Sequence, residues 1–525
     1  MKKENERPII EIRTALRVYL MHKLANLLLA VFLQIFLAKI LLPSSYGTYA
    51  LLLAVLLVSE RLLSFGIDRT ILRFTPPLMA AGDSTSLHWL ACRLAAVRFT
   101  ALLIMMLVLA AGASYFARLT SFELAPSMLY AFAVWYISYS LLIDADAIAQ
   151  SLFAHSLAAT AITLEIVART AAIIFLWLGG RDIGPDSIVV ISASTSFGAA
   201  VILGIRLWLF AHAQTSTMRP SAEVDVRDAP LFAASAYAST LGWLITSPGV
   251  LRIVASHGLN VVPFAAFSFI QALSVSLQRG LPGLLILPSL EAVLARLGSN
   301  THRERMFSVA SLIFKAELIC VTPVIIFSLI AGPDLISLIS RPEYSEFYPI
   351  LPAMMVIIIL HTIYRICEIT MSIQFEHRAF LLLWPLSVAS TGLLYFKVDE
   401  WGLWGVLLIP MIESVLRVAF LLIAYRRLLT WRALDPMRAL LITAVAALTI
   451  FAIVVSRAFL NITMHATMHA FVWATIAVTL FLASLILIRP FSGSEIAVIS
   501  STLPNSWSIV AKFLALLERP SERRN

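Results

Sequence analysis

Long apolar stretches recur along the whole chain and are separated by short polar connections. Each stretch is about 20 residues long, which is the length that a helix rising 1.5 Å per residue needs to cross a bilayer. The pattern predicts about fourteen membrane-spanning helices. Their predicted bounds are 24–42, 47–67, 95–117, 125–149, 157–179, 187–210, 231–252, 262–285, 308–330, 347–372, 380–396, 402–424, 439–460 and 466–488.

The overall composition supports this interpretation. Of the 525 residues, 60% are hydrophobic and 13% are charged, whereas a typical soluble domain is about 25% charged. A soluble core could not bury so many apolar side chains. The sequence therefore predicts an all-α polytopic membrane protein. We interpret the first stretch as a retained span, because no small-residue cleavage site follows it.

Lys and Arg residues are distributed unevenly over the connections, which predicts the orientation in the membrane. If the N-terminus is cytoplasmic, the inner segments hold most of the 39 Lys and Arg residues. The outer segments then hold only Lys39, Arg118, Arg181, Arg252, Arg341, Lys397 and Arg457. Both termini are therefore predicted to be cytoplasmic. The net charge of +9 reflects this bias and attraction to membrane lipids, and no nucleic-acid partner is expected.

Both ends of the chain carry amphipathic segments beside basic residues. Residues 9–20 and 507–519 place apolar side chains at helical spacing, with Arg and Lys on other faces. We expect both segments to lie as helices in the cytoplasmic headgroup layer, where they anchor the protein.

Signatures of enzymatic chemistry are sparse. The sequence has no P-loop, no G-x-S-x-G turn and no outer loop long enough to hold a glycan acceptor. His465 and His469 are four residues apart, but no Glu adjoins them as in a zinc-protease helix. Cys92, Cys320 and Cys367 are far apart and indicate neither a disulfide nor a zinc site. We therefore expect no enzyme, no metal and no cofactor.

Three segments carry a family resemblance. Residues 41–74, "LLPSSYGTYALLLAVLLVSERLLSFGIDRTILRF", combine an aromatic-G-x-Y start, a long helix and an R-F ending. Residues 332–355, "GPDLISLISRPEYSEFYPILPAMM", lead into the tenth predicted span, and residues 401–417, "WGLWGVLLIPMIESVLR", form the entry to the twelfth. Together they resemble polysaccharide flippases, the O-antigen and exopolysaccharide repeat-unit translocases of the multidrug/oligosaccharidyl-lipid/polysaccharide exporter superfamily. Tyr46 stands where that family usually has Phe.

The resemblance implies two six-helix lobes around a central cavity, at 24–228 and 229–430, followed by two extra spans at 431–489. Residues 1–23 and 490–525 would then be the cytoplasmic ends. It also implies a lipid-diphosphate-linked oligosaccharide as cargo, moved across the bacterial inner membrane by alternating access for lipopolysaccharide or exopolysaccharide biosynthesis. Polysaccharide polymerases and export proteins are then expected partners. An exporter of small cations from the same superfamily, and a membrane glycan polymerase or ligase, stay open as alternatives.

The second and eighth predicted spans look like copies of one another. Each begins with a helix breaker and aromatic residues, continues as an apolar run and ends in a polar–Arg pair and a glycine. Glu60–Arg61 thus corresponds to Gln278–Arg279, as expected for a transporter built from internal repeats. Chance similarity between two apolar helices is the alternative.

Arg61 and Arg279 are predicted to lie at similar depth, roughly 22 Å along their helices from the outer side and therefore in the cytoplasmic half of the bilayer. An Arg facing lipid at that depth is costly, so each should face a wet cavity or extend towards the headgroups. We expect both guanidinium groups to bind the diphosphate of the cargo. The remaining predicted substrate-binding residues are Glu60, Gln278, Lys23 and Arg252.

The other charges inside predicted spans divide into pairs and single groups. Three pairs can be neutralised on one helix and are predicted to be structural: Glu165–Arg169, Glu413–Arg417 and Arg365–Glu368. Asp144 and Asp146 point about 200° apart on a helix and cannot form a carboxylate dyad. With Glu317 they are candidates for ion coupling, because intramembrane carboxylates commonly carry protons or Na⁺. Lys315 requires partners on another helix.

Overall fold

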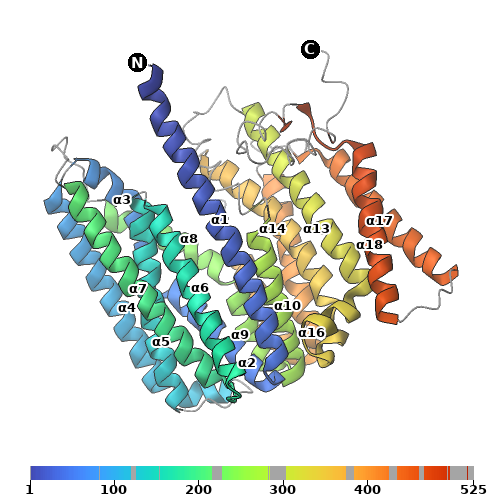
Figure 1. Ribbon diagram of the computed structural model, residues 1–525, viewed down its shortest axis with the longest axis horizontal. Coiled ribbons are helices and arrows are strands. Elements are labelled where there is room, and N and C mark those ends of the chain that lie inside the picture. The colour runs from blue at the N-terminus through green and yellow to red at the C-terminus, as the bar shows by residue number, and fades with distance from the viewer. Residues whose placement is uncertain are drawn as a thin grey trace. The chain divides into compact units, whose positions relative to one another are not determined.

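All the structural elements of the protein are helices in the part of the chain that the structure describes (Figure 1). The structure is a computed structural model. It describes residues 2–81, 83–119, 126–152, 154–215, 228–281, 283, 303–373, 383–424, 434–459, 466–493, 495–496 and 517. They divide into two compact units, Met1–Ser268 with Ser387–Gly402, and Phe269–Leu386 with Leu403–Asn525. The predicted lobe boundary after residue 228 stays a prediction.

The first unit is a layered helix bundle. Its elements are α1 (Lys2–Ile40), α2 (Pro43–Leu62), α3 (Ile67–Ala81), α4 (Ser84–Leu119), α5 (Pro126–Ser151), α6 (His155–Leu178), α7 (Pro185–Thr215), α8 (Ala229–Leu244), α9 (Pro248–Gly258) and the start of α10 (Val261–Arg279). Helix α7 lies against α5 and α6, and α6 lies against α1 (Figure 1). Small side chains such as Ala149, Ala158 and Ala199 fill part of this core and let the helices approach closely.

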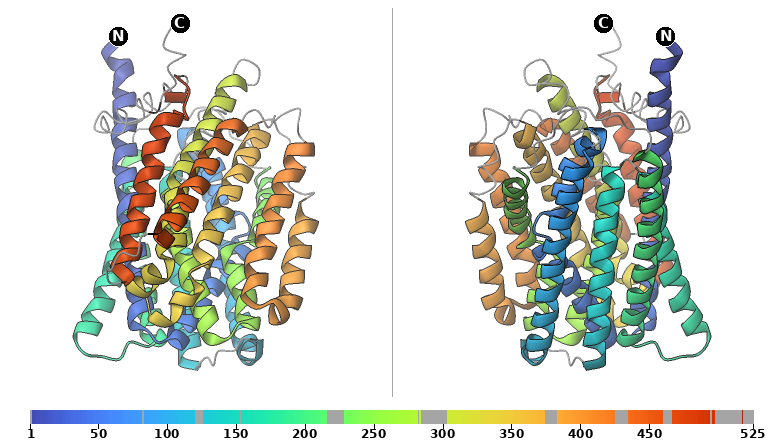
Figure 2. Two further views of the ribbon diagram at one scale, coloured as in Figure 1. Left: turned by 90° about the vertical axis from the view of Figure 1, so that its right-hand side faces the viewer. Right: turned by 90° about the vertical axis from the view of Figure 1, so that its left-hand side faces the viewer.

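The second unit is organised around one long helix. Its elements are α13 (Arg303–Ile339), the 3₁₀ helix η1 (Pro342–Phe347), α14 (Ile350–Ile373), most of α16 (Trp384–Ala424), α17 (Pro436–Phe459) and α18 (Ala466–Ile488). Helix α13 packs against α14, α17, α18 and η1. Helices α17 and α18, drawn in orange and red in Figure 2, also pack against each other.

The described residues contain eleven helices long and apolar enough to cross a membrane, or twelve if the bent pair α2–α3 is one span. The predicted count of fourteen differs at three places. The second predicted span is part of that bent pair, which turns by 50°. The predicted span 231–252 is divided between two helices. Helix α8 ends at Leu244, and α9 begins at Pro248 after its capping residue Ser247. The third difference is in α16.

Helix α16 is 41 residues long, about 60 Å at 1.5 Å per residue and twice the hydrocarbon thickness. Gly402 interrupts it with φ 53° and ψ −138°, a conformation that is not helical and that is essentially restricted to glycine. The predicted spans 380–396 and 402–424 therefore correspond to the two sides of this break. Residues 380–382 lie outside the described part of the chain.

The N-terminal amphipathic segment belongs to the first helix. Helix α1 runs without interruption over 39 residues, so residues 9–20 are continuous with the first predicted span, and their placement in the headgroup layer stays a prediction. The segment 507–519 lies outside the described residues, apart from Leu517.

The aromatic-G-x-Y sequence of the family resemblance contributes to the core of the first unit. Tyr46 and Tyr49 are buried at the start of α2. The Tyr46 hydroxyl donates to Gln34 Oε1 of α1 at 3.0 Å. The ring of Tyr49 stacks on Trp135 of α5, with ring centroids 6.4 Å apart. These two tyrosines therefore join α1, α2 and α5.

Candidate functional site

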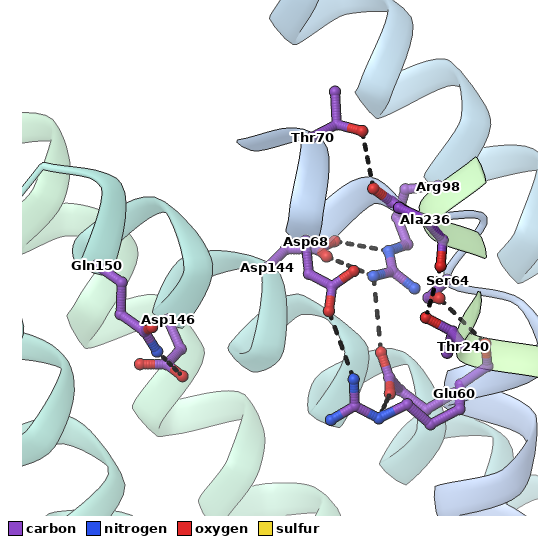
Figure 3. A network of polar contacts seen from close by, with 12 residues as sticks. Glu60, Ser64, Asp68, Thr70, Arg98, Asp144, Asp146, Gln150, Ala236 and Thr240 are labelled. Carbon is purple, nitrogen blue, oxygen red and sulfur yellow. Dashed lines mark hydrogen bonds and ion pairs between the residues drawn. The ribbon is translucent and has the colours of Figure 1, made fainter. Parts of the chain in front are cut away.

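Five charged side chains meet where α2 ends and α3 begins, and we name them the arginine–carboxylate network. They are Glu60, Arg61, Asp68, Arg98 and Asp144. Figure 3 shows Arg98 of α4 between Asp144 of α5 and Glu60 of α2. The network thus joins four helices of the first unit at membrane depth.

Arg98 is the centre of the network. Its Nε donates to Asp144 Oδ2 at 2.6 Å, and its Nη2 pairs with the other carboxylate oxygen, which gives the two-pronged geometry that favours guanidinium–carboxylate binding. The same Nη2 lies 3.8 Å from Glu60 Oε1. The side chains of Arg98 and Glu60 are only 6% and 4% exposed. Both charges are therefore retained inside the protein by each other and by Asp144.

Arg61 has a different environment, although it is adjacent to Glu60. Its Nε is 3.7 Å from Glu60 Oε2, and its Nη1 is 3.4 Å from Asp68 Oδ2. Its side chain is 52% exposed. Arg61 therefore makes two long ion-pair contacts and leaves about half of its surface open for an anionic ligand.

The break between α2 and α3 positions the exposed part of the network. Phe65 and Gly66 both have positive φ, 47° and 74°, so the chain turns before α3 begins. A Cβ at Gly66 would lie 2.5 Å from the carbonyl oxygen of Ala233 in α8, which only glycine avoids. The Tyr237 hydroxyl of α8 donates to the carbonyl of Leu62 at 2.5 Å. Helix α8 therefore holds the turn that places Asp68 beside Arg61.

The charge balance of the network defines what it can do chemically. Three carboxylates face two guanidinium groups, so the network carries one excess negative charge when every member is ionised. An anion that bound Arg61 would compete with Glu60 and Asp68 for the same guanidinium. Such an exchange of partners is available to Arg61 but not to Arg98, which is buried.

The other predicted substrate-binding residues are divided between the two units. Lys23 is exposed on α1, whereas Arg252 on α9 is only 5% exposed. In the second unit, Gln278 is partly buried and Arg279 is exposed as the last residue of α10. Solvent or a ligand can therefore reach Lys23 and Arg279 more easily than Arg252. The binding roles of all four residues stay predictions.

The three predicted ion-coupling residues have three different environments. Asp144 is bound by Arg98, as described above. Asp146 accepts a hydrogen bond from Gln150 Nε2 at 2.9 Å and points away from Asp144 (Figure 3). Glu317 in α13 is buried and makes hydrogen bonds but no ion pair among the described residues. Asp144 therefore has a cation beside it, whereas Glu317 has none among the described residues.

The predicted intrahelical pairs are found at two of three places. Glu165 and Arg169 are 3.3 Å apart, and Ser196 Oγ also donates to Glu165 at 3.2 Å. Glu413 and Arg417 are 2.7 Å apart. The third pair combines Arg365, which is partly buried, with Glu368, whose side chain lies outside the described residues.

Lys315 finds its partners far along the chain. Its ammonium group is fully buried and lies 2.7 Å from Glu495 and 3.2 Å from Asp435. It also donates to the carbonyl of Pro490 at 3.0 Å. Lys315 therefore fixes the segment after α18 and the residue before α17 to α13, inside the second unit.

Among the described residues, no three His, Cys, Asp or Glu side chains are placed so that they could hold a metal ion. His469 accepts a hydrogen bond from Trp473 Nε1 at 2.8 Å, which occupies one of its ring nitrogens. His465 lies outside the described residues.

Sequence reasoning did not identify Arg98 and Asp68 as site residues. Arg98 is one of the basic residues that the orientation analysis counts on the inner side, although it lies inside the predicted span 95–117. That span contains Arg98, and the next predicted span contains Asp144. These two opposite charges on neighbouring spans are the feature of the sequence that indicates an ion pair between helices. The role of Asp68 depends on the turn at Gly66, which the pattern alone does not predict.

Comparisons with known proteins establish the fold. No protein-family model and no curated protein sequence matches the chain. Among solved structures, the chain is similar to the lipid II flippase MurJ in an inward closed conformation, with a TM-score of 0.59 and 13% identity over 90% of this chain and 98% of that one. It is also similar to an inward-facing multidrug resistance MATE transporter of the MOP superfamily, with a TM-score of 0.61 and 14% identity over 79% of this chain and 98% of that one.

The protein is therefore a multi-pass, all-α membrane protein with the fold of MOP-superfamily transporters. A third structure, of MATE in complex with MaD3S, matches 81% of this chain with a TM-score of 0.50 and 16% identity. The superfamily resemblance seen in the sequence is confirmed at the level of the fold. The polysaccharide-flippase subtype stays a prediction.

Proposed function

We propose that the protein is a flippase that moves lipid-diphosphate-linked oligosaccharides across the bacterial inner membrane, for lipopolysaccharide or exopolysaccharide biosynthesis. The observation that carries this proposal is the environment of Arg61. Arg61, at the end of a membrane helix, is 52% exposed and makes only long ion-pair contacts with the described residues, while Arg98 pairs with Glu60 and Asp144. An exposed guanidinium group can bind phosphate oxygens with two parallel hydrogen bonds.

Arg279 of the second unit supplies a second group of the same kind. It is exposed and ends α10, as Arg61 lies in the last turn of α2. A cation at a helix C-terminus is stabilised by the helix dipole even without a ligand. A test of substrate binding must therefore include a cation that ends a helix but has no proposed role. Lys39, exposed in the last turn of α1, meets that requirement.

The experiment uses the full chain in proteoliposomes with a synthetic lipid diphosphate that carries a fluorescent sugar. Translocation is measured as loss of the sugar's accessibility to an impermeant quencher. Arg61→Ala and Arg279→Ala should each lower the translocation rate at limiting substrate by roughly 10- to 100-fold, because a charge-assisted hydrogen bond contributes about 1.5–3 kcal/mol. Lys at either position should restore only part of the rate, because it keeps the charge but loses the planar fork.

Lys39→Ala should translocate at the wild-type rate. Normal rates for both Arg→Ala variants, at equal protein abundance, would show that the two arginines only extend towards the headgroups. Export of a cationic dye in place of the lipid diphosphate would instead support the alternative of a small-cation exporter. Growth of longer glycan from the lipid-linked donor would support a polymerase.

A further inference from the structure

Glu317 is a carboxyl group in the apolar stretch of α13, and no cation among the described residues lies beside it. The apolar stretch of this helix is Ala310–Ile339, and Glu317 lies about two turns, or roughly 10 Å, from its beginning. The residue is 1% exposed. An ionised carboxylate at this depth is costly unless it is paired, because neither lipid nor the apolar protein interior solvates it.

Two hydrogen-bonding groups surround the carboxyl group of Glu317. The backbone N–H of Gly283 donates to Oε2 at 2.9 Å, and the Thr362 hydroxyl of α14 donates to Oε1 at 2.9 Å. A Cβ at Gly283 would lie 3.1 Å from both Oε2 and Thr362 Oγ1, so glycine lets the backbone approach the carboxyl group. Each carboxyl oxygen therefore has one partner.

The described titratable groups of the neighbouring helices face other partners. Only the thiol of Cys320, one turn further along α13, is an electrostatic neighbour of Glu317. Other charged groups on α13 and on the elements packed against it have partners of their own: Lys315 contacts Asp435 and Glu495, Arg438 donates to the carbonyl of Ile488, Arg341 pairs with Glu343, and His469 accepts from Trp473. His361 has Arg365 and Arg417 as its electrostatic neighbours.

Burial without a described cation favours the neutral acid over the anion. On protonation the Thr362 contact reverses: the Glu317 O–H donates to Thr362 Oγ1 and the carbonyl oxygen still accepts from Gly283, so both carboxyl oxygens stay hydrogen-bonded without a charge. A hard metal cation would need several oxygen ligands, and the described residues supply only Glu317 and Thr362 as side-chain ligands here.

We infer that Glu317 is a proton-binding site, which holds its proton while Gly283 and Thr362 contact it and releases it to water, leaving a carboxylate, when those contacts open. Its use as the coupling site for transport rests on the proposed function. The protonation itself does not depend on any substrate.

Infrared difference spectroscopy of the whole protein in lipid nanodiscs tests the protonation. The wild type should show the absorbance of a protonated carboxyl group between about pH 6 and pH 8, well above the pH of about 4.3 at which an ordinary Glu loses its proton. Glu317→Gln should lose that absorbance and keep the fold, since its amide preserves both hydrogen bonds. Glu413→Gln is the matched control, because Glu413 is equally buried but pairs with Arg417, and it should keep the absorbance.

Identical spectra for the wild type and Glu317→Gln would overturn the inference, as would loss of the absorbance on adding NaCl at constant pH, which would indicate Na⁺ binding. Coupling is tested separately with the fluorescent lipid diphosphate. An imposed pH gradient should change the wild-type rate, and Glu317→Gln should lose that dependence. If the protein translocates the lipid without responding to the gradient, coupling fails while the proposed function stands. If it translocates no lipid, the proposed function fails while the infrared result stands.

Discussion

At the scale of single residues, Arg98 illustrates how a charge is retained at membrane depth. The guanidinium group is buried and contacts carboxylates from two other helices, Asp144 and Glu60. Removing one partner from such a site leaves the remaining charges without compensation in a medium that solvates them poorly. Arg98 should therefore matter more for folding than the exposed Arg61 does, although both belong to the same network.

We predict that Arg98→Ala destabilises the protein by about 3–5 kcal/mol or prevents its accumulation, because Asp144 and Glu60 are stranded without a cation. The midpoint of thermal unfolding in detergent measures the effect. Arg93→Ala is the control on the same helix: Arg93 is exposed and lies over the ring of Trp89, so its loss should change stability by only about 0.5 kcal/mol. An unchanged midpoint for Arg98→Ala would mean that the pairing contributes little.

At the scale of elements, the turn between α2 and α3 determines the geometry of the candidate site. Two consecutive residues with positive φ, Phe65 and Gly66, end the helix and redirect the chain. Helix α8 packs against this turn through the Ala233 carbonyl and the Tyr237 hydroxyl. The same turn brings Asp68 to Arg61, so a change in the turn should alter the contacts of Arg61.

We predict that Gly66→Ala lowers stability by about 1–3 kcal/mol, because its φ is left-handed and its Cβ would meet a backbone oxygen that cannot move independently. The control is Gly198→Ala inside α7, where nothing lies within 4 Å of the added Cβ. That change should be neutral or stabilising by up to about 1 kcal/mol, because Ala favours the helix. Equal unfolding midpoints for the two variants would contradict this account of the turn.

At the scale of the whole molecule, the uneven distribution of basic residues determines the predicted orientation. The segment between α13 and α14 carries Arg341 and the exposed Glu343 and is predicted to lie outside. The segment between α3 and α4 lies between groups of Arg residues and is predicted to lie inside, and the exposed Thr85 follows it in the first turn of α4. The two segments therefore report on opposite faces of the membrane.

We predict that an impermeant thiol reagent labels Glu343→Cys in intact spheroplasts and labels Thr85→Cys only after permeabilisation. Both substitutions are made in a variant in which Cys92, Cys320 and Cys367 are replaced, because two of these cysteines are exposed and could react. Both positions are accessible side chains, so a failure to react reflects the membrane and not burial. Labelling of Thr85→Cys before permeabilisation would reverse the predicted orientation.

The sequence by itself determined the class of the protein and most of its spans. The length of an apolar run is a local property, and a bilayer imposes the same length on every helix that crosses it. The predicted spans 125–149 and 157–179, for example, agree within a few residues with α5 and α6. Ion pairs within one helix, such as Glu165–Arg169, could also be predicted from the sequence, because helical spacing alone brings the two side chains together.

Only the tertiary structure decided which charges meet across helices and where the spans break. Arg98 pairs with Asp144, and Lys315 with Glu495, a residue 180 positions later. Helical periodicity specifies the face on which a side chain lies, but packing selects the neighbour and its depth. The same reason applies to Glu317. The sequence shows that this residue is ionisable. Only the packing of the helices shows that its described neighbours are Gly283 and Thr362 and not a cation.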